Sequence, residues 1–266
     1  MTVKSSHQAL SITACDFAVG LAREAMQILR EGSQREVGDI RTKAAGDVST
    51  ELDRKIETFF RRRLHERFPE HAFLGEEGGG SWPVNHAVWI VDPIDGSLNF
   101  VHGYPQYSIS LALVIDGKPV AACVADPCRD EIFSAAKGHG AQLNGQLIKV
   151  SETTALIEAL AATVFPKPTA TFMADYLDQL GLVMRQVGGV RRSGSMALEM
   201  AYLAAGRCDV FWERAMGPWD AAAGLLLIEE AGGMVFSLDG QPILLSDHIA
   251  AATPRLAETW RTLLTK

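Results

Sequence analysis

The chain has 266 residues, of which 47% are hydrophobic and 21% are charged. This composition is ordinary for a globular protein, and the length is enough to bury a sizeable core. A net charge of −7 argues against binding to a nucleic-acid backbone, which needs a basic surface. An anionic substrate is still possible, because a bound metal ion can reverse the charge of a local site.

The first half of the chain predicts two helices followed by a series of strands. Apolar residues recur at helical spacing over residues 9–30 and again over 49–67, and we expect Gly32 and Gly38 to end the first helix. Asp116-Gly117 predicts a tight hairpin, and Gly75 to Gly80 predicts a loop. The strands are predicted at 71–74, 88–91, 107–115, 119–126, 131–136 and 140–143.

After about residue 150, helices alternate with short strands. The helices are predicted at 171–181, 194–205 and 219–231, and the strands at 160–165, 208–212 and 233–236. A closing helix is expected over 254–264, with Thr253 as its N-cap and Pro254 in its first turn. The pattern favours a mixed α/β chain of layered sheets and helices. We expect one domain over 1–266, with sub-lobes of about 1–150 and 151–266.

The cysteines and the N-terminal residues point to an intracellular protein. No two of the four cysteines are spaced Cys-x-x-Cys, so a zinc site or a disulfide framework is disfavoured and buried thiols in a reducing cytosol are expected. The opening M-T-V-K-S-S-H-Q lacks the apolar run of a signal peptide. No stretch approaches the ~20 apolar residues of a membrane span. We therefore expect a cytoplasmic location.

Two close aspartates at the end of a buried strand indicate chemistry. In V-D-P-I-D-G-S-L-N-F, residues 91–100, Asp92 and Asp95 flank Pro93, and Gly96 lets the chain turn into a helix near Ser97. Two carboxylates this close repel each other, and a shared proton or a bound cation would relieve the repulsion. Oxygen-only ligands favour Mg²⁺ over zinc. The structural alternative is a turn with Asp95 as an N-cap.

Further carboxylates lie at other junctions between loops and regular elements. They are Glu76-Glu77 after a strand, Asp220 before an apolar helix, and Asp47 with Asp53 around the start of the second helix. Each alone has an explanation as a cap or a surface residue. Together with the aspartate pair they form the set of acids that a multi-metal oxygen site needs.

These motifs resemble the inositol monophosphatase family over residues 10–260. The matching motifs are G-E-E (75–77), D-P-I-D-G-S-L-N-F (92–100), H-G-Y-P (102–105), W-D-A-A-A-G (219–224) and E-A-G-G (230–233). The resemblance implies an αβαβα sandwich of the sugar-phosphatase type, with the active site in a cleft between two sub-lobes. It also implies a Mg²⁺-dependent, lithium-sensitive phosphatase and a homodimer, in which Trp82 and Trp212 could serve an interface or the core.

The resemblance also implies a ligand set for two to three Mg²⁺ ions. Glu76, Asp92 and the carbonyl of Ile94 would hold one ion, and Asp92, Asp95 and Asp220 a second. A third, weaker ion would lie near Glu76, which counts among the catalytic residues. Two metal ions about 4 Å apart can bind both the nucleophile and the leaving oxygen of an in-line displacement. Metal-activated water would then hydrolyse the ester without a phosphoenzyme.

By the same resemblance, the amides of Gly96 and Ser97 would cradle the phosphate at a helix N-terminus, where free N–H groups favour anions. The Ser97 hydroxyl, oriented by Asp53, would position the attacking water. Two residues depart from the family pattern: Ser97 stands where threonine is usual, and Leu52 precedes Asp53 where some members have threonine. Because the hydroxyl is kept at position 97, we expect activity to survive.

Most of the residues expected to contact the substrate lie in the second half of the chain. The resemblance implies that Glu213 hydrogen-bonds inositol hydroxyls, that Gly194 and Ser195 lie near the ring, and that Asp95 and Asp220 also contact the substrate. The alternatives are a surface acid at Glu213 and an N-cap at Ser195. Lys43 could screen the anionic site or be a solvated lysine.

Inositol monophosphate is the favoured small-molecule substrate, because Asn99-Phe100 and His102-Gly103 look most like the inositol monophosphatase branch. Histidinol phosphate and a broader range of sugar phosphates are the alternatives. A regulatory binding protein is a third possibility. It is less favoured because every metal carboxylate is retained.

Overall fold

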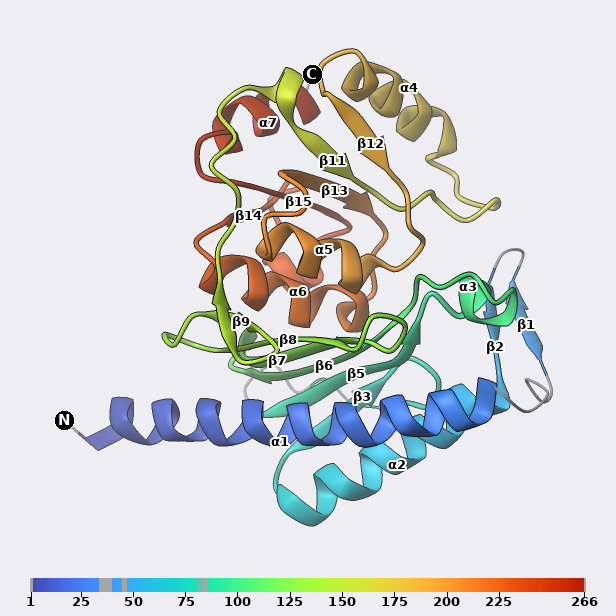
Figure 1. Ribbon diagram of the computed structural model, residues 1–266, viewed down its shortest axis with the longest axis vertical. Coiled ribbons are helices and arrows are strands. Elements are labelled where there is room, and N and C mark those ends of the chain that lie inside the picture. Colours follow the sequence, from blue (N-terminus) through green and yellow to red (C-terminus); the bar gives the residue numbers. More distant parts are fainter. Residues whose placement is uncertain (1, 34–39, 45–46, 81, 83–85, 266) are drawn as a thin grey trace.

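Two β-sheets alternate with helices in αβαβα layers (Figure 1). A computed structural model describes residues 2–33, 40–44, 47–80, 82 and 86–265. The predicted mixed α/β architecture of layered sheets is confirmed. None of the described helices is both long enough and apolar enough to cross a membrane.

The first layer consists of α1 (Thr2–Ser33) and α2 (Glu51–Arg67), which cover one face of the larger sheet (Figure 1). Buried residues of α1 such as Ala18, Leu21 and Ala25 follow helical spacing and pack against that sheet. The helix is longer than predicted at both ends. Gly32 lies within its last turn, so the expectation that this glycine ends the helix is wrong, and Gly38 lies outside the described residues.

The larger sheet has eight strands in the order β10-β9-β8-β7-β6-β5-β3-β4. Val88 to Asp95 of β5 are buried throughout, because α1 and α2 cover one face of the sheet and α6 covers the other. The hairpin predicted at Asp116-Gly117 joins β6 to β7. The strands are β3 (Ala72–Gly75), β4 (Gly79–Gly80), β5 (Val88–Asp95), β6 (Ser108–Ile115), β7 (Lys118–Asp126), β8 (Glu131–Ala136), β9 (Ala141–Leu143) and β10 (Gln146–Ile148).

The smaller sheet has five strands in the order β12-β11-β13-β15-β14. They are β11 (Leu160–Ala162), β12 (Gly189–Arg191), β13 (Val210–Arg214), β14 (Met234–Ser237) and β15 (His248–Ala252). Trp212 of β13 is fully buried between the rings of Tyr176 and Trp260, so it belongs to the core. Trp82 is partly buried and packs against the core cluster that includes residues of α5 and α6.

Helices α5 (Met196–Ala204) and α6 (Pro218–Glu230) lie between the two sheets, and α4 (Met173–Met184) and α7 (Ala257–Leu264) cover the outer face of the smaller one (Figure 1). Residues 220–228 of α6 are all buried, which explains the apolar run after Asp220. Two 3₁₀ turns, Leu156–Glu158 and Ile243–Leu245, complete the connections.

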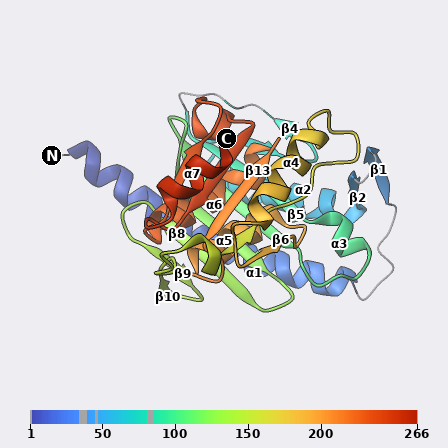
Figure 2. The same ribbon diagram turned by 90° about the horizontal axis from the view of Figure 1, so that it is seen from above.

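A short hairpin of β1 (Arg41–Ala44) and β2 (Asp47–Ser49) lies beside α3 (Ser97–Val101) at one end of the molecule in both views (Figures 1 and 2). The sequence pattern did not predict this hairpin, nor strands β4, β10, β12 and β15. The hairpin carries Lys43 and leads directly into the start of α2.

Three local expectations are wrong. Strand β5 does not end at Asp92 but continues to Asp95, because Asp92 and Asp95 pair with Ser110 and Ser108 of β6. The last helix begins at Ala257, and the Thr253 hydroxyl is buried without a hydrogen-bond partner, so it caps nothing. Of the cysteines, Cys15, Cys123 and Cys208 are buried as expected, but Cys128 is exposed.

Candidate active site

Three buried carboxylates meet where the first turn of α6 faces strand β5. One oxygen each of Asp92, Asp95 and Asp220 lies within 4.8 Å of the others. Residues three apart in a regular strand point to opposite faces. The pairing register of β5 shifts between Asp92 and Asp95, and this irregularity lets both side chains reach Asp220 on one side of the sheet.

The three carboxylates are electrostatically unfavourable as they stand. Burial, followed by repulsion from Glu76 and Asp95, raises the pKa of Asp92 well above its usual range. Burial and the charges of Asp95 and Glu76 do the same to the pKa of Asp220. Burial also raises the pKa of Asp95, although its hydrogen bonds oppose the shift. The cluster therefore favours the binding of protons or of a cation.

Glu76 lies at the edge of this cluster. Burial raises its pKa, while Lys43 and a hydrogen bond with Asp92 oppose the rise. Lys43 Nζ is 3.1 Å from Glu76 Oε1 and also contacts Glu77. The expectation that Lys43 screens the anionic site therefore agrees with its position. Asp47 lies in β2.

The donor set fits a hard divalent cation. The cluster offers carboxylate oxygens, and the buried main chain of Ile94 runs between Asp92 and Asp95. The carbonyl of Ile94 accepts a hydrogen bond from Ser97 Oγ (2.8 Å), and its amide donates to Asp92 Oδ1 (2.9 Å). A site of oxygen donors without nitrogen or sulfur suits Mg²⁺ or a similar ion.

Asp95 is also a structural residue. Its Oδ2 accepts hydrogen bonds from Ser195 Oγ (2.5 Å) and from the Ala197 amide (2.8 Å), and its Oδ1 accepts one from the Met196 amide (3.2 Å). Ser108 Oγ donates a further bond of 3.3 Å. Asp95 thus caps α5 from across the site.

The sequence suggests two N-caps, at Asp95 and at Ser195, and only the second is found at its position. The N-cap of α3 is Gly96, so the alternative that Asp95 caps its own helix is wrong. Ser195 does occupy the N-cap position of α5, but its side chain makes no capping hydrogen bond there.

Loop residues of the two halves of the chain meet at Gly96. Its φ is 93°, and a Cβ there would lie 3.0 Å from the Gly194 carbonyl. The side-chain amide of Asn99 donates to the carbonyls of Ser193 (2.8 Å) and Gln106 (2.6 Å), which holds the loop before α5 against α3. The predicted phosphate loop and the predicted substrate loop are therefore neighbours.

The Ser97 hydroxyl lies against α2. It is 3.0 Å from Asp53 Oδ1 and 2.8 Å from the Ile94 carbonyl. The other oxygen of Asp53 accepts hydrogen bonds from the amide and the hydroxyl of Thr50. The Asp53 amide in turn donates to Thr50 Oγ1 (3.3 Å), which completes a capping box at the start of α2. Burial raises the pKa of Asp53.

Glu213 is buried in β13, with only 2% of its surface exposed, so the alternative of a surface acid is wrong. Its carboxyl group accepts hydrogen bonds from the amides of Val164 (2.5 Å) and Arg214 (2.9 Å) and from Thr163 Oγ1 (3.3 Å). Burial raises the pKa of Glu213 to about 8 despite these bonds. A protonated Glu213 can donate a hydrogen bond as well as accept one.

Several partners of these side chains carry no signal in the sequence. Ser108, Thr163 and Val164 each contact a site acid, but they come from strands or loops that meet the acids only through sheet pairing or through the fold. No local motif marks them. The adjacent pairing of Ser108 with Asp95 across β6 and β5 is visible only once the register is known.

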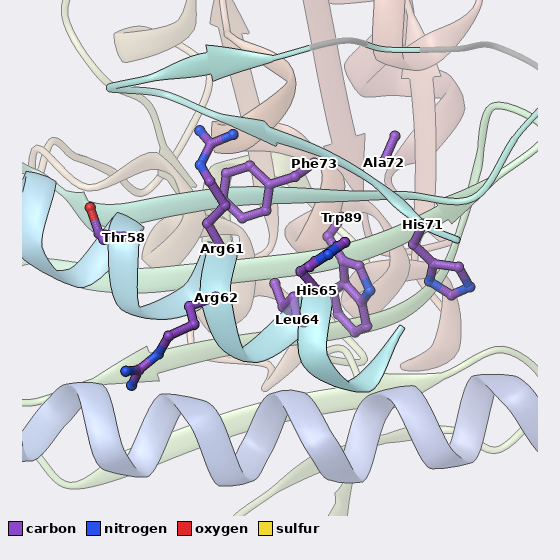
Figure 3. A pocket seen from close by; sticks show the side chains of 9 residues that line it. All are labelled: Thr58, Arg61, Arg62, Leu64, His65, His71, Ala72, Phe73 and Trp89. Carbon is purple, nitrogen blue, oxygen red and sulfur yellow. The ribbon is translucent and has the colours of Figure 1, made fainter. Parts of the chain in front are cut away.

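A separate pocket of about 460 Å³ lies between α2 and strands β3 and β5 (Figure 3). It shares no residue with the acidic cluster. Its wall includes Arg61, whose guanidinium lies 4.2 Å from the centre of the Phe73 ring. The lining residues are Thr58, Arg61, Arg62, Leu64, His65, His71, Ala72, Phe73 and Trp89.

Comparison with known proteins agrees with the geometry. A sequence model of the inositol monophosphatase family matches residues 13–265. The Nus factor SuhB of Pseudomonas aeruginosa is 38% identical over 247 residues, which cover 90% of this chain and 91% of that protein. The inositol-1-monophosphatase of Rhizobium meliloti is 42% identical over 212 residues, covering 77% and 80%.

Solved structures are similar over nearly the whole chain. The extragenic suppressor protein suhB from Bartonella henselae has a TM-score of 0.90 at 34% identity, covering 96% of this chain and 99% of that one. The inositol monophosphatase of Thermotoga maritima has a TM-score of 0.84 at 32% identity, covering 94% and 95%.

Proposed function

The chain belongs to the inositol monophosphatase family, and we propose that it is a Mg²⁺-dependent phosphomonoesterase that hydrolyses inositol monophosphate to inositol and phosphate. The observation that carries the proposal is the buried triplet of Asp92, Asp95 and Asp220. Three buried acids with raised pKa values are costly to the fold, and a role in holding a cation accounts for them.

We assign the metal ligands as follows. Glu76, Asp92 and the Ile94 carbonyl would hold one Mg²⁺, Asp92, Asp95 and Asp220 a second, and the surroundings of Glu76 a third, weaker one. Bound Mg²⁺ supplies Lewis-acid chemistry, because it makes a water molecule more acidic and stabilises the alkoxide that leaves.

The side chains around the metal ligands position the reactants. Because the Ser97 hydroxyl can donate to Asp53, its lone pairs are free to accept a hydrogen bond from the attacking water. The amides of Gly96 and Ser97 would bind the phosphate oxygens. A bond forms between the water oxygen and phosphorus, the bond from phosphorus to the ester oxygen breaks, and a proton lost by the attacking water passes to the departing alkoxide.

We assign Glu213, Gly194 and Ser195, together with Asp95 and Asp220, to the substrate side. The buried carboxyl group of Glu213 supports this assignment, because a raised pKa lets it offer both a donor and an acceptor to neighbouring ring hydroxyls. Histidinol phosphate and other sugar phosphates are the competing substrates, since the metal site would treat their phosphate in the same way.

Four wider properties belong to the proposal: two sub-lobes, a cytoplasmic location, a homodimer and sensitivity to lithium. The division into sub-lobes near residue 150 is supported by the sheets, because the described strands of the larger one come before that point and those of the smaller one after it. A cytoplasmic homodimer sensitive to lithium follows from the family resemblance. A regulatory role is a second candidate function, favoured by the relatives named Nus factor SuhB.

The test is phosphate release by purified protein in Mg²⁺, with inositol 1-phosphate and histidinol phosphate compared side by side. We expect preference for the inositol ester and loss of turnover in a chelator. Preference for histidinol phosphate would overturn the substrate assignment but not the metal site. Unchanged turnover in Asp95→Asn would contradict the metal assignment, whereas a regulatory protein should keep its partner in that variant.

A further inference from the structure

A buried glutamate outside the acidic cluster lies at the centre of the loop that carries Glu76. Glu57 of α2 is only 4% exposed. Its Oε2 accepts a hydrogen bond from the Glu77 amide (2.8 Å), and its Oε1 accepts one from the Gly78 amide (3.0 Å). The loop from Gly75 to Gly78 therefore curls around a single carboxylate.

The glycines of this loop provide the space that the carboxylate fills. A Cβ at Gly75 would lie 2.4 Å from Glu57 Oε2, and a Cβ at Gly78 would lie 2.6 Å from Glu57 Oε1. Neither glycine has a positive φ, so the backbone conformation alone does not require glycine at either position. The sequence G-E-E-G is thus complementary to the side chain of Glu57.

The same loop is fixed on its other side by the larger sheet. The Glu76 amide donates to the Val91 carbonyl of β5 (3.2 Å), one residue before Asp92. Glu76 is therefore held between a hydrogen bond from its own amide to β5 and a hydrogen bond from the next amide to Glu57. These two contacts fix the backbone on either side of Glu76, whose side chain forms a hydrogen bond with Asp92.

Arg61 holds Glu57 in this orientation. Its Nη2 lies 3.0 Å from Glu57 Oε1 and 3.3 Å from the Gly79 carbonyl, while its guanidinium covers the ring of Phe73 (Figure 3). An ion pair four residues apart on a helix could form in solvent. Here the carboxylate is buried and directed at the loop, so the pair supports the loop.

Helix α2 contacts two loops of the site, one through Asp53 and one through Glu57. Asp53 lies one turn before Glu57 and is also buried, and it contacts the Ser97 hydroxyl. Two acids four residues apart repel each other on a helix. Their presence together among the buried residues of α2 agrees with a role in holding two loops, one at Ser97 and one at Glu76.

We propose that Glu57 is a positioning residue that fixes the Glu76 loop and thereby sets the affinity of the site for Mg²⁺. The proposal rests on the proposed function, because it takes Glu76 as a metal ligand. In this role Glu57 contacts neither the substrate nor the metal. It acts only through the amides of Glu77 and Gly78.

The first test is Glu57→Gln, with Mg²⁺ binding measured by calorimetry. A glutamine has the same shape, but its NH₂ group would face one of the two amide donors and release that side of the loop. Loss of a group that orients a metal ligand typically weakens metal binding by 10–100-fold, and we expect about 10-fold here. Hydrogen exchange should become faster at Glu77 and Gly78, and kcat at saturating Mg²⁺ should change less than the Mg²⁺ concentration for half-maximal rate.

A second variant and a control make the test specific. Gly78→Ala places a methyl group against Glu57 Oε1 and should displace the Glu57 carboxylate from the loop. It should weaken Mg²⁺ binding as Glu57→Gln does, and it tests the proposal even if Glu57→Gln fails to fold. Glu66→Gln makes the same chemical change on the same helix at a side chain that is 61% exposed, and it should leave Mg²⁺ binding unchanged.

The outcomes separate the inference from the proposed function. If the wild-type protein binds Mg²⁺ and releases phosphate, but both variants bind Mg²⁺ as tightly as the wild type, the role of Glu57 is overturned and the function stands. If the wild-type protein binds no Mg²⁺, the proposed function fails, and the inference fails with it.

Discussion

The carboxylate of Asp95 accepts a hydrogen bond of 2.8 Å from the amide of Ala197, which lies 102 positions later in the chain. One side chain thus serves both the acidic cluster and the N-terminus of α5. Substitutions at Asp95 should therefore affect two measurable properties, turnover and stability, by different amounts.

Asp95→Asn and Asp95→Ala should separate these two roles. Both should abolish phosphate release, because neither supplies a charged ligand. Asparagine is a good helix cap, whereas loss of a cap to alanine costs about 1 kcal/mol. We expect Asp95→Ala to be less stable than Asp95→Asn by roughly that amount in urea unfolding without metal. Equal stability of the two variants would show that the capping bonds contribute little.

Asp92→Asn should stabilise the metal-free protein. The pKa of Asp92 is raised by burial and by Glu76 and Asp95, so its charged form is unfavourable without a cation. Asparagine can still accept the bond from the Ile94 amide. The melting temperature in a chelator should therefore rise, as is common when a strained functional residue is replaced.

The same variant should lose its response to metal. A ligand at 100 times its Kd stabilises a protein by about 2.7 kcal/mol. Mg²⁺ should raise the melting temperature of the wild type and leave Asp92→Asn unchanged. A metal-dependent shift of equal size in both proteins would remove Asp92 from the ligand set.

Glu213 should make stability depend on pH. Its pKa is raised in the folded state from 4.5 to about 8. A group with a raised folded pKa contributes stability that is fully present below its unfolded pKa and is lost as the pH rises through the folded value. The wild type should therefore lose stability between pH 4.5 and 8, by up to a few kcal/mol, since each pKa unit corresponds to about 1.4 kcal/mol.

Glu213→Gln is the matched control for this effect. It keeps the shape but does not titrate, so the difference in unfolding free energy between wild type and variant should change across that pH window. Measurement in a chelator at several pH values isolates Glu213, because the other acids are common to both proteins. A constant difference would contradict the raised pKa.

Lys43→Gln should tighten Mg²⁺ binding. Lys43 contacts Glu76 and Glu77, and a cation entering near Glu76 must displace it. Because the pair is partly exposed, we expect its loss to cost at most about 1 kcal/mol of stability. The Mg²⁺ concentration for half-maximal phosphate release should fall a few-fold. A rise in that concentration would indicate that Lys43 helps the site in some other way.

Local patterns predicted most of the helices and drew attention to the acids that form the buried triplet. The helical spacing of Ala18, Leu21 and Ala25 follows from burial of one face, and the apolar run after Asp220 follows from burial on all sides. Asp95 is the last residue of β5 and Asp220 lies in the first turn of α6, whereas Asp92 lies within β5. The spacing of Asp92 and Asp95 is visible in the sequence, but the continuation of β5 past Asp92 is not.

What the sequence could not predict depends on contacts between distant segments. Strand β15, His248–Ala252, is rich in alanine and has little strand propensity, but β13 and β14 pair with it on both sides. Likewise, the capping of α5 by Asp95 requires that β5 and α5 meet. Secondary-structure propensity and hydrophobic periodicity carry no information on such contacts between distant segments.

The position of α5 and α6 between the two sheets has a consequence for the order of biosynthesis. Asp92 and Asp95 leave the ribosome long before Ser195 and Asp220, so the growing chain carries two acids without their later partners. The proposed metal site can be completed only after α6 has been synthesised and has taken its place against β5. Acquisition of the metal is therefore expected to be a late step in the maturation of the protein, and a chain interrupted before α6 should gain no stability from added Mg²⁺.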